Sequence, residues 1–233
     1  MIDWGLVLES TKETILITFI STFLAYLVGL PLGVILNATS SKGVYPNRIF
    51  NSVLSIIVNV LRSIPCLIIV VLAMPISRAI FDRATGKWYT MIIPLFLTSF
   101  AYVARVVEQS LSEVDSGKFE AIRSLGASNS QLIFKVAIPE SAPSLIVGLS
   151  VTVVSILGYT SFAYNIGAGG LISQIWTFYT RNTGNYTSEW MFWIMIIFVV
   201  LIVQIVQELG LFISRKIDKR RKLRWNDYLL VLY

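Results

Sequence analysis

Long stretches of apolar residues with almost no charge limit most strongly what this sequence can fold into. Each is close to the length that crosses a bilayer as a helix, and they lie at 15–36, 49–74, 91–107, 142–164 and 190–207. Of the 233 residues 55% are hydrophobic and only 14% are charged, against about 25% charged in an average soluble domain. Backbone groups in lipid must be paired within the chain, which favours helices. The sequence therefore predicts an all-α integral membrane protein with about five transmembrane helices.

The second stretch contains an arginine and a proline. Pro65 cannot donate the helical hydrogen bond of its position, so it predicts a kink or an interruption. Arg62 lies just before Ser63 and Pro65, where a charge is costly unless it faces protein, a cavity or the membrane edge. Arg62 then either lines a polar pathway or extends to the headgroups from a helix end. On the sequence alone we favour the second interpretation.

The first stretch carries two glycines four residues apart, Gly29 and Gly33. This spacing permits a neighbouring helix to pack closely against them. Glycine is also simply tolerated in membrane helices, and the sequence does not distinguish the two explanations.

A polar segment at 116–139 separates the third stretch from the fourth. Its first part repeats apolar residues every third position at Phe119, Ile122 and Leu125, which predicts a short amphipathic helix. Gly126 follows where a helix most often ends in a left-handed residue. Ser128 and Gln131 have the spacing of a capping box, which predicts a second helix with its apolar side at Leu132, Ile133 and Val136. We expect Pro139 to end that helix before the next span.

Lysine and arginine counts predict the orientation in the membrane. With five spans, thirteen of these residues fall in the 37–48 loop, the polar segment with Arg105, and the C-terminal tail, whereas five fall on the other side. The positive-inside rule then places the polar segment and the C-terminus in the cytoplasm and the N-terminus outside. The net charge of +6 is explained by this loop bias, and we expect a lipid bilayer and no nucleic acid as the surroundings.

The sequence offers no catalytic group and no metal site. It has no histidine and a single cysteine, Cys66, which excludes a serine–histidine hydrolase, most zinc sites and an internal disulfide. Gly167, Gly169 and Gly170 form a glycine cluster, but no Lys-Ser/Thr pair follows as in a P-loop. We therefore expect no catalytic residues, no cofactor and no nucleotide hydrolysis by this chain. The acids near the spans lie at their ends, which argues against a proton-coupled carrier.

The polar segment resembles the EAA loop of ATP-binding-cassette (ABC) importer permeases. Glu120-Ala121-Ile122 is followed after three residues by Gly126, and after nine more by Val136-Ala137-Ile138-Pro139. Ile122 stands where that pattern has alanine. The resemblance is closer to the five-span permeases of bacterial methionine importers and covers about residues 12 to 217. It also rests on these segments: Arg62-Ser63-Ile64-Pro65, Ala104 to Glu108, Gly158-Tyr159 and Gly167 to Leu171.

The resemblance implies a type I ABC importer permease fold with a cytoplasmic coupling helix, in a multi-pass protein of the bacterial cytoplasmic membrane. It implies a homodimer, two cytoplasmic ATPase subunits that bind ATP and Mg²⁺, and an external substrate-binding lipoprotein. The residues that it implies in ATPase coupling are Glu120, Ala121, Arg123, Leu125, Gly126, Ile138 and Pro139. We expect the apolar stripe to be shared between the permease itself and a groove on the ATPase.

The translocation path and the outer segment are further expectations. We expect the path to lie between the second, fourth and fifth spans, with these candidate residues: Arg62, Ser63, Pro65, Ser155, Tyr159, Ser161 and Asn165. The segment around Gly167, Gly169 and Gly170 is either an outer gate, a docking surface for the binding protein, or a turn that only packs.

Two alternatives to a methionine importer stay open on the sequence. One is a permease for another small amino acid or a betaine-like solute, and the other is a membrane scaffold without a transport path. We expect residues 1–217 to form one permease domain and 218–233 to be a basic cytoplasmic tail, to which we assign no function.

Overall fold

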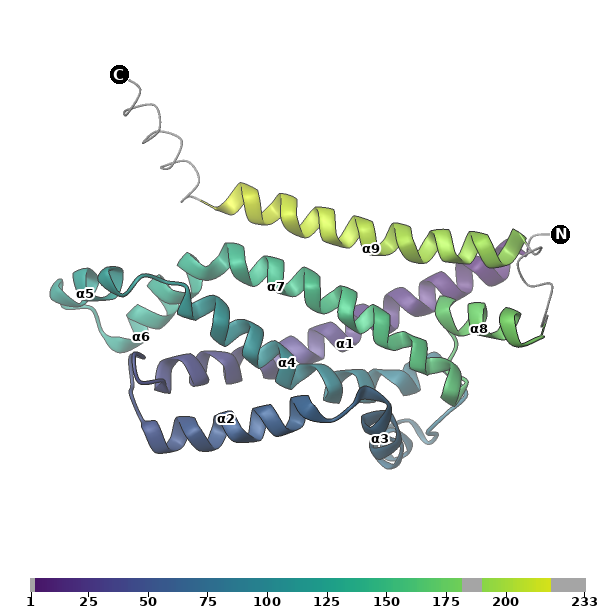
Figure 1. The fold of residues 1–233 in the computed structure, drawn as a ribbon, viewed down its shortest axis with the longest axis horizontal. Helices are drawn as coiled ribbons and strands as arrows, with labels where there is room; N and C mark the ends of the chain where they lie inside the picture. Colours follow the sequence, from purple (N-terminus) through teal and green to yellow (C-terminus); the bar gives the residue numbers. More distant parts are fainter. Residues whose placement is uncertain (1–2, 182–189, 219–233) are drawn as a thin grey trace, which may run out of the picture.

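Helices account for the regular structure in the computed structural model, which describes residues 3–181 and 190–218. The longest are α1 (Trp4–Thr39), α4 (Ile92–Ser112), α7 (Ile138–Tyr159) and α9 (Trp190–Ile217), and Figure 1 shows them running along one elongated bundle. No strand occurs in the described ranges. By length and composition four helical segments can cross a membrane, and a fifth can if one bent pair is a single span. The predicted all-helical membrane fold is confirmed.

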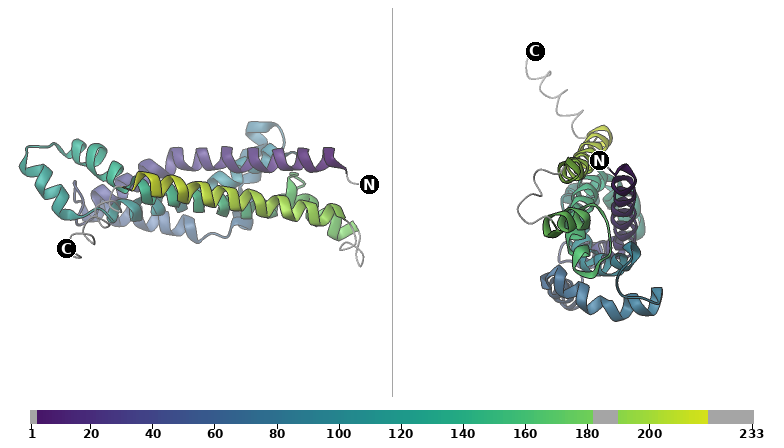
Figure 2. Two further views of the ribbon diagram at one scale, coloured as in Figure 1. Left: turned by 90° about the horizontal axis from the view of Figure 1, so that it is seen from above. Right: turned by 90° about the vertical axis from the view of Figure 1, so that its right-hand side faces the viewer.

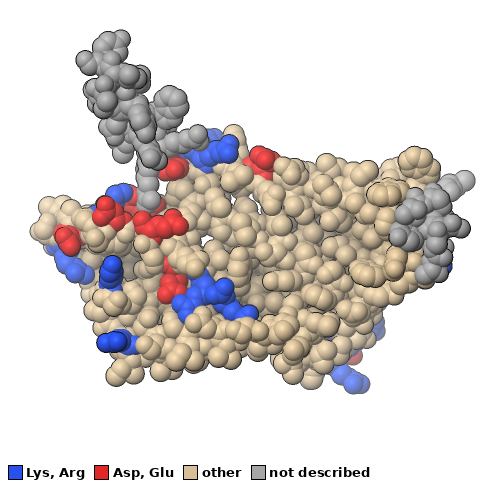
Figure 3. Space-filling model, viewed as in Figure 1, with Lys and Arg blue, Asp and Glu red and all other residues tan. Residues whose placement is uncertain are grey.

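The helices extend beyond the stretches predicted from the sequence. The first begins at Trp4 and not at Ile15, and the last continues to Ile217 and not to Gln207. The predicted limits followed the nearest charged or polar side chains. Those side chains do not end a helix, because a helix end that projects from the bilayer tolerates them. Figure 3 shows charged residues gathered mainly towards the end that carries α5 (Ser116–Ser124), with most of the remaining face uncharged.

The second apolar stretch is not one straight span. It forms α2 (Arg48–Ser63) and α3 (Cys66–Phe81), which meet at an angle of 98° across Ile64 and Pro65. Figures 1 and 2 show α3 lying across the long axis that α2 follows. The interruption predicted at Pro65 is therefore confirmed, and it is a sharp break with no continuous kinked helix.

The α1–α4 interface is built on the two glycines of the first stretch. A Cβ atom on Gly29 would lie 2.6 Å from the carbonyl oxygen of Phe100, and one on Gly33 would lie 2.5 Å from that of Ala104. Such separations are impossible for real atoms. The glycines therefore allow close approach of the two backbones, and of the two explanations left open by the sequence, close packing is the one the structure supports.

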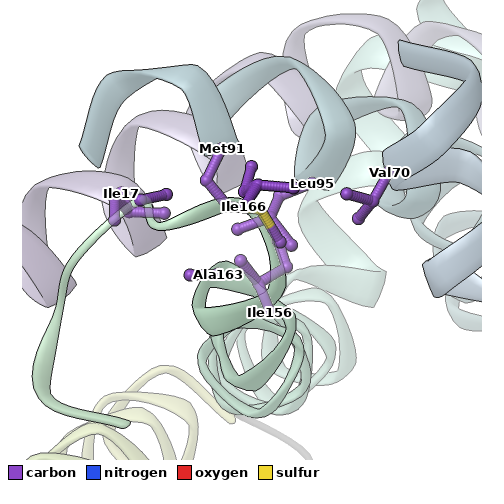
Figure 4. Close-up of a cluster of buried hydrophobic side chains, with 8 residues drawn as sticks. Ile17, Val70, Met91, Leu95, Ile156, Ala163 and Ile166 are labelled. Carbon is purple, nitrogen blue, oxygen red and sulfur yellow. The ribbon is translucent and has the colours of Figure 1, made fainter. Parts of the chain in front are cut away.

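The buried core joins segments that are distant in the sequence. Figure 4 shows Ile17 of α1 and Val70 of α3 converging with Leu95 of α4 and Ile156 of α7. The short 3₁₀ helices η1 (Trp88–Met91) and η3 (Thr160–Ile166) close the same cluster through Met91, Ala163 and Ile166. The α2–α3 break is thereby held against α4 and the end of α7.

The glycine interface gives a test of the fold. Gly33→Ala should lower the free energy of unfolding by about 1–3 kcal/mol, because the added methyl group meets a backbone carbonyl that cannot move aside. Thermal unfolding of the purified protein in detergent measures the change. The matched control is Gly158→Ala, where a Cβ meets no atom within 4 Å and should cause no loss of stability. Equal melting temperatures for the two variants would contradict the proposed packing.

Candidate coupling segment and membrane cavity

The first helix of the polar segment is α5, which begins after Asp115 and ends at Ser124. The Asp115 carboxylate accepts a hydrogen bond from the Gly117 N–H at 2.8 Å and caps the helix. At the other end Gly126 has a φ of +84°, its N–H donates to the Arg123 carbonyl, and the next N–H donates to the Ile122 carbonyl. These two bonds form a Schellman motif, so the predicted glycine stop is confirmed.

Two contacts attach α5 to the membrane helices. Phe119 packs against a buried cluster that includes Val107 and Leu111 of α4. Lys118 forms an ion pair with Glu140 at the start of α7. Through these contacts α5 is fixed to both α4 and α7.

The residues of the apolar stripe of α5 differ in burial. Phe119 and Ile122 are half-buried against the protein itself, whereas Leu125 is 85% exposed at the helix end. Ala121 is exposed as well. Glu120 and Arg123 are also exposed and line a hollow of about 480 Å³ between α5, the end of α4 and the loop at residues 40–44.

The second half of the segment differs from the prediction at Pro139. The capping box of Ser128 and Gln131 is present and opens α6 (Asn129–Gln131). The chain then continues through a π-helical stretch, η2 (Leu132–Ala137), directly into α7, so Pro139 does not end the helix. A proline ring clashes with the carbonyl four residues earlier, and the wider π turn relieves this clash. Ile138 donates instead to the Ile133 carbonyl, five residues back.

This π turn presents a residue that the sequence analysis missed. Phe134 is 68% exposed, while Leu132 and Val136 are buried, so Phe134 and Leu125 are both large apolar side chains left uncovered at the α5 end. The sequence did contain an indication that Phe134 is exposed, because it directly follows Leu132 and Ile133. A helix with a single apolar face cannot bury three successive residues.

A cavity of about 310 Å³ lies at the α2–α3 break. It brings together four of the seven path residues expected from the sequence, Arg62, Ser63, Pro65 and Tyr159. The cavity is also lined by four residues that were not predicted from the sequence: Ile64, Cys66, Thr98 and Tyr102. Thr98 and Tyr102 are one helical turn apart on α4, an i, i+4 pair that shares a face.

Arg62 lies in the last turn of α2, next to α4. Its guanidinium carbon lies 5.9 Å from the ring centroid of Tyr102, and Tyr102 is near the middle of the span Trp88–Ser112. The break after Ser63 turns the chain aside and leaves Arg62 beside α4.

The other three expected path residues lie elsewhere. Ser155 donates to the Val151 carbonyl of its own helix, at 2.8 Å, and is not among the residues that line the cavity. Ser161 is half-buried and Asn165 is exposed, both in η3 beyond the end of α7. The structure does not bring these three to the cavity.

The glycine cluster is tied to α1. Gly167, Gly169 and Gly170 all have φ between +62° and +87° and lead into α8 (Leu171–Arg181), a helix that the sequence analysis missed although Leu171, Ile175 and Phe178 share one helical face. The Glu13 carboxylate accepts from the Gly170 N–H at 2.9 Å, and the Thr14 hydroxyl accepts from the Leu171 N–H at 2.8 Å. Two side chains of α1 thus satisfy donors at the start of α8, at the end of the molecule opposite α5.

Comparison with known proteins places this architecture in a family. The family described as the binding-protein-dependent transport system inner membrane component matches residues 29–219. The probable D-methionine transport system permease protein MetI of Pasteurella multocida is 38% identical over 168 residues, covering 72% of this chain and 77% of the relative. The Escherichia coli K12 D-methionine permease MetI is 35% identical, covering 67% and 71%.

Solved structures agree. The MetNI methionine ABC transporter in an inward-facing conformation matches 92% of this chain and 97% of its own chain, with 32% identity and a TM-score of 0.85. An amino acid ABC transporter crystallised with histidines shares the fold at 21% identity and a TM-score of 0.71. With the five apolar segments and the EAA-like turn at Gly126, these matches show that the chain belongs to the inner membrane components of binding-protein-dependent transport systems, the permeases of ABC transporters.

Proposed function

We propose that this chain is the membrane subunit of an ATP-driven importer of methionine, as the D or the L isomer. The observation that carries the proposal is the match to the MetNI methionine transporter over 92% of the chain at 32% identity. The relatives at 35–38% identity are D-methionine permeases. In this proposal ATP and Mg²⁺ bind to a separate ATPase, and this chain contributes no catalytic residue, cofactor or metal ligand.

The ATPase would dock on α5 and the following turn. Leu125 and Phe134 supply uncovered apolar surface, and the charged pair Glu120 and Arg123 borders it. Burial of two such side chains in a groove is a usual source of binding energy at an interface. We assign Ala121, Ile138 and Pro139 to the same segment through the family pattern, with Pro139 acting through the π turn.

A movement of the ATPase would reach the membrane through one helical unit. Residues Asn129–Ile166 form a single 38-residue helical stretch, and Lys118 of α5 is paired to Glu140 within it. At 1.5 Å per residue this stretch is about 57 Å long, more than the thickness of the hydrocarbon core. Displacement at its α6 end therefore moves Tyr159 at the cavity, which provides a rigid-body route between inward-facing and outward-facing states.

The assembly follows the family. We propose a homodimer with two ATPases on the cytoplasmic side and a substrate-binding lipoprotein outside, in the bacterial cytoplasmic membrane. The lysine and arginine bias supports a cytoplasmic α5 end and an external N-terminus. Reporter fusions at the two termini test this orientation. Residues 1–217 form the permease domain in this proposal, and nearly all of the 218–233 tail lies outside the described residues.

The cavity residues Arg62, Ser63, Pro65 and Tyr159 would form part of the path. We retain Ser155, Ser161 and Asn165 only as residues that could enter it in another conformation. Gly167, Gly169 and Gly170 would act as an outer gate held to α1 by Glu13, or as a docking surface for the lipoprotein.

Uptake by the reconstituted complex tests the function. Proteoliposomes that contain the permease, its ATPase and its binding protein should accumulate labelled methionine only when ATP is supplied on the ATPase side. A catalytically inactive ATPase is the control. Uptake of another amino acid or a betaine in place of methionine would overturn the substrate, and no uptake of any substrate would favour a scaffold.

Gly126 is the most specific position in the coupling segment. Gly126→Val should lower ATP-driven uptake at least tenfold at a normal membrane level, because a β-branched residue is strained at a φ of +84°. A Cβ there meets no atom of this chain within 4 Å, so the defect is in the turn and its docking, not in packing of the permease. Gly126→Asn, which tolerates this conformation, should retain more uptake. Normal uptake by the valine variant would refute the assignment.

The two uncovered apolar side chains give a binding test. Leu125→Ser and Phe134→Ser should each weaken ATPase binding to the solubilised permease by about tenfold. Both side chains are mostly exposed in the permease alone, so the melting temperature of the free permease should not change. Leu125→Met serves as the conservative control. Undiminished affinity in both serine variants would place the docking surface elsewhere.

A further inference from the structure

The cavity at the α2–α3 break lies beside the middle of a helical segment that is long and apolar enough to cross a membrane. The span Trp88–Ser112 has its midpoint at Phe100, and two of the side chains that line the cavity, Thr98 and Tyr102, lie on either side of that midpoint. At 1.5 Å per residue both are within about 3 Å of it along the helix. A polar cavity at this depth is where broken helices of transporters bind their substrates.

The charge of this cavity is positive. Arg62 lies over the Tyr102 ring, and the ion pairs found between described residues, Arg105–Glu108 and Lys118–Glu140, do not involve it. Helix α3 begins at the cavity with Pro65 and Cys66, and no side chain caps it. The first N–H groups of a helix carry a partial positive charge, which adds to that of the guanidinium. A cation near mid-membrane is costly unless an anion accompanies it.

The remaining walls suit a small molecule that is polar at one end. Thr98, Tyr102 and Tyr159 offer hydroxyl groups, while the tyrosine rings and Ile64 offer apolar surface. The Thr98 hydroxyl lies 3.6 Å from the Cys66 sulfur. A volume of about 310 Å³ is at the lower end of the range of small-molecule sites, which limits the occupant to a small ligand.

We propose that this cavity binds the α-carboxylate of an amino acid substrate during its passage, with Arg62 as the residue that pairs with the carboxylate. This inference rests on the proposed importer function and adds a selectivity step within the membrane to that of the external binding protein. The α3 N-terminus would contribute N–H donors, and the tyrosine rings would cover the side chain of the substrate. Tyr159 connects the site to the helix that carries the ATPase movement.

The single cysteine of the chain provides a direct probe, because Cys66 lines the cavity and is half-buried. The permease–ATPase complex, without binding protein, is treated with a small methanethiosulfonate reagent, both nucleotide-free and with ATP. The modified Cys66 peptide is then quantified by mass spectrometry. L-Methionine should slow modification at least threefold in one of the two states. Methioninol, which has the same side chain and amine but no carboxylate, should protect much less.

Two charge-neutralising variants complete the test. Arg62→Gln should abolish protection by methionine. Arg78→Gln, the matched control, removes an arginine from the far end of α3 and should retain protection. Unreactive Cys66 in both states, no protection by methionine, or equal protection by methioninol would each overturn the proposed site. Uptake by the complete complex is measured in parallel, so wild-type uptake without protection rejects this site and leaves the importer function standing.

Discussion

Backbone hydrogen bonding in an apolar environment governs this structure. An unpaired N–H or C=O group in the hydrocarbon core costs several kcal/mol, so continuous helix is the default and each interruption needs compensation. At the α2–α3 break the freed groups border a polar cavity. Before Pro139 a π turn maintains the backbone hydrogen bonds of the helix. At Gly167–Gly170 and the start of α8, side chains from α1 accept hydrogen bonds from backbone N–H groups. The interruptions fall in the regions assigned to transport, coupling and the outer gate.

The compensations also connect these regions. The π turn joins α6 to α7, so Phe134 of the proposed coupling surface and Tyr159 belong to one helical unit, to which the Lys118–Glu140 ion pair attaches α5. The Gly29–Gly33 packing holds α1 against α4, and Glu13 and Thr14 attach α1 to the start of α8. In the proposed mechanism the unit of α1 and α4 and the long α7 unit are the two parts that move relative to each other, since packed interfaces change in discrete steps.

Much of this organisation follows from local sequence. The length of the apolar stretches predicted a membrane protein. Ser128 and Gln131 predicted the N-cap of α6, and Gly126 predicted the end of α5, because capping depends on residues only a few positions apart. Prediction failed where partners are distant. The contact of Arg62 with Tyr102 could not be predicted, because it depends on the angle of the α2–α3 break. The sequence predicts a helix end at Pro139 because a π turn has no clear sequence signal. The contact of Glu13 is not predictable because its partner lies 157 residues away.

Contact between the coupling segment and the ATPase is the central claim, and site-specific photo-cross-linking tests it most directly. A photoreactive residue at Leu125, in the assembled complex in membranes, should form a covalent adduct with the ATPase. The same residue at Leu72, which is 62% exposed on α3 away from the α5 end, should not. An ATPase adduct at Leu125 alone is the predicted result. Adducts at neither position, or at Leu72 only, would contradict the account.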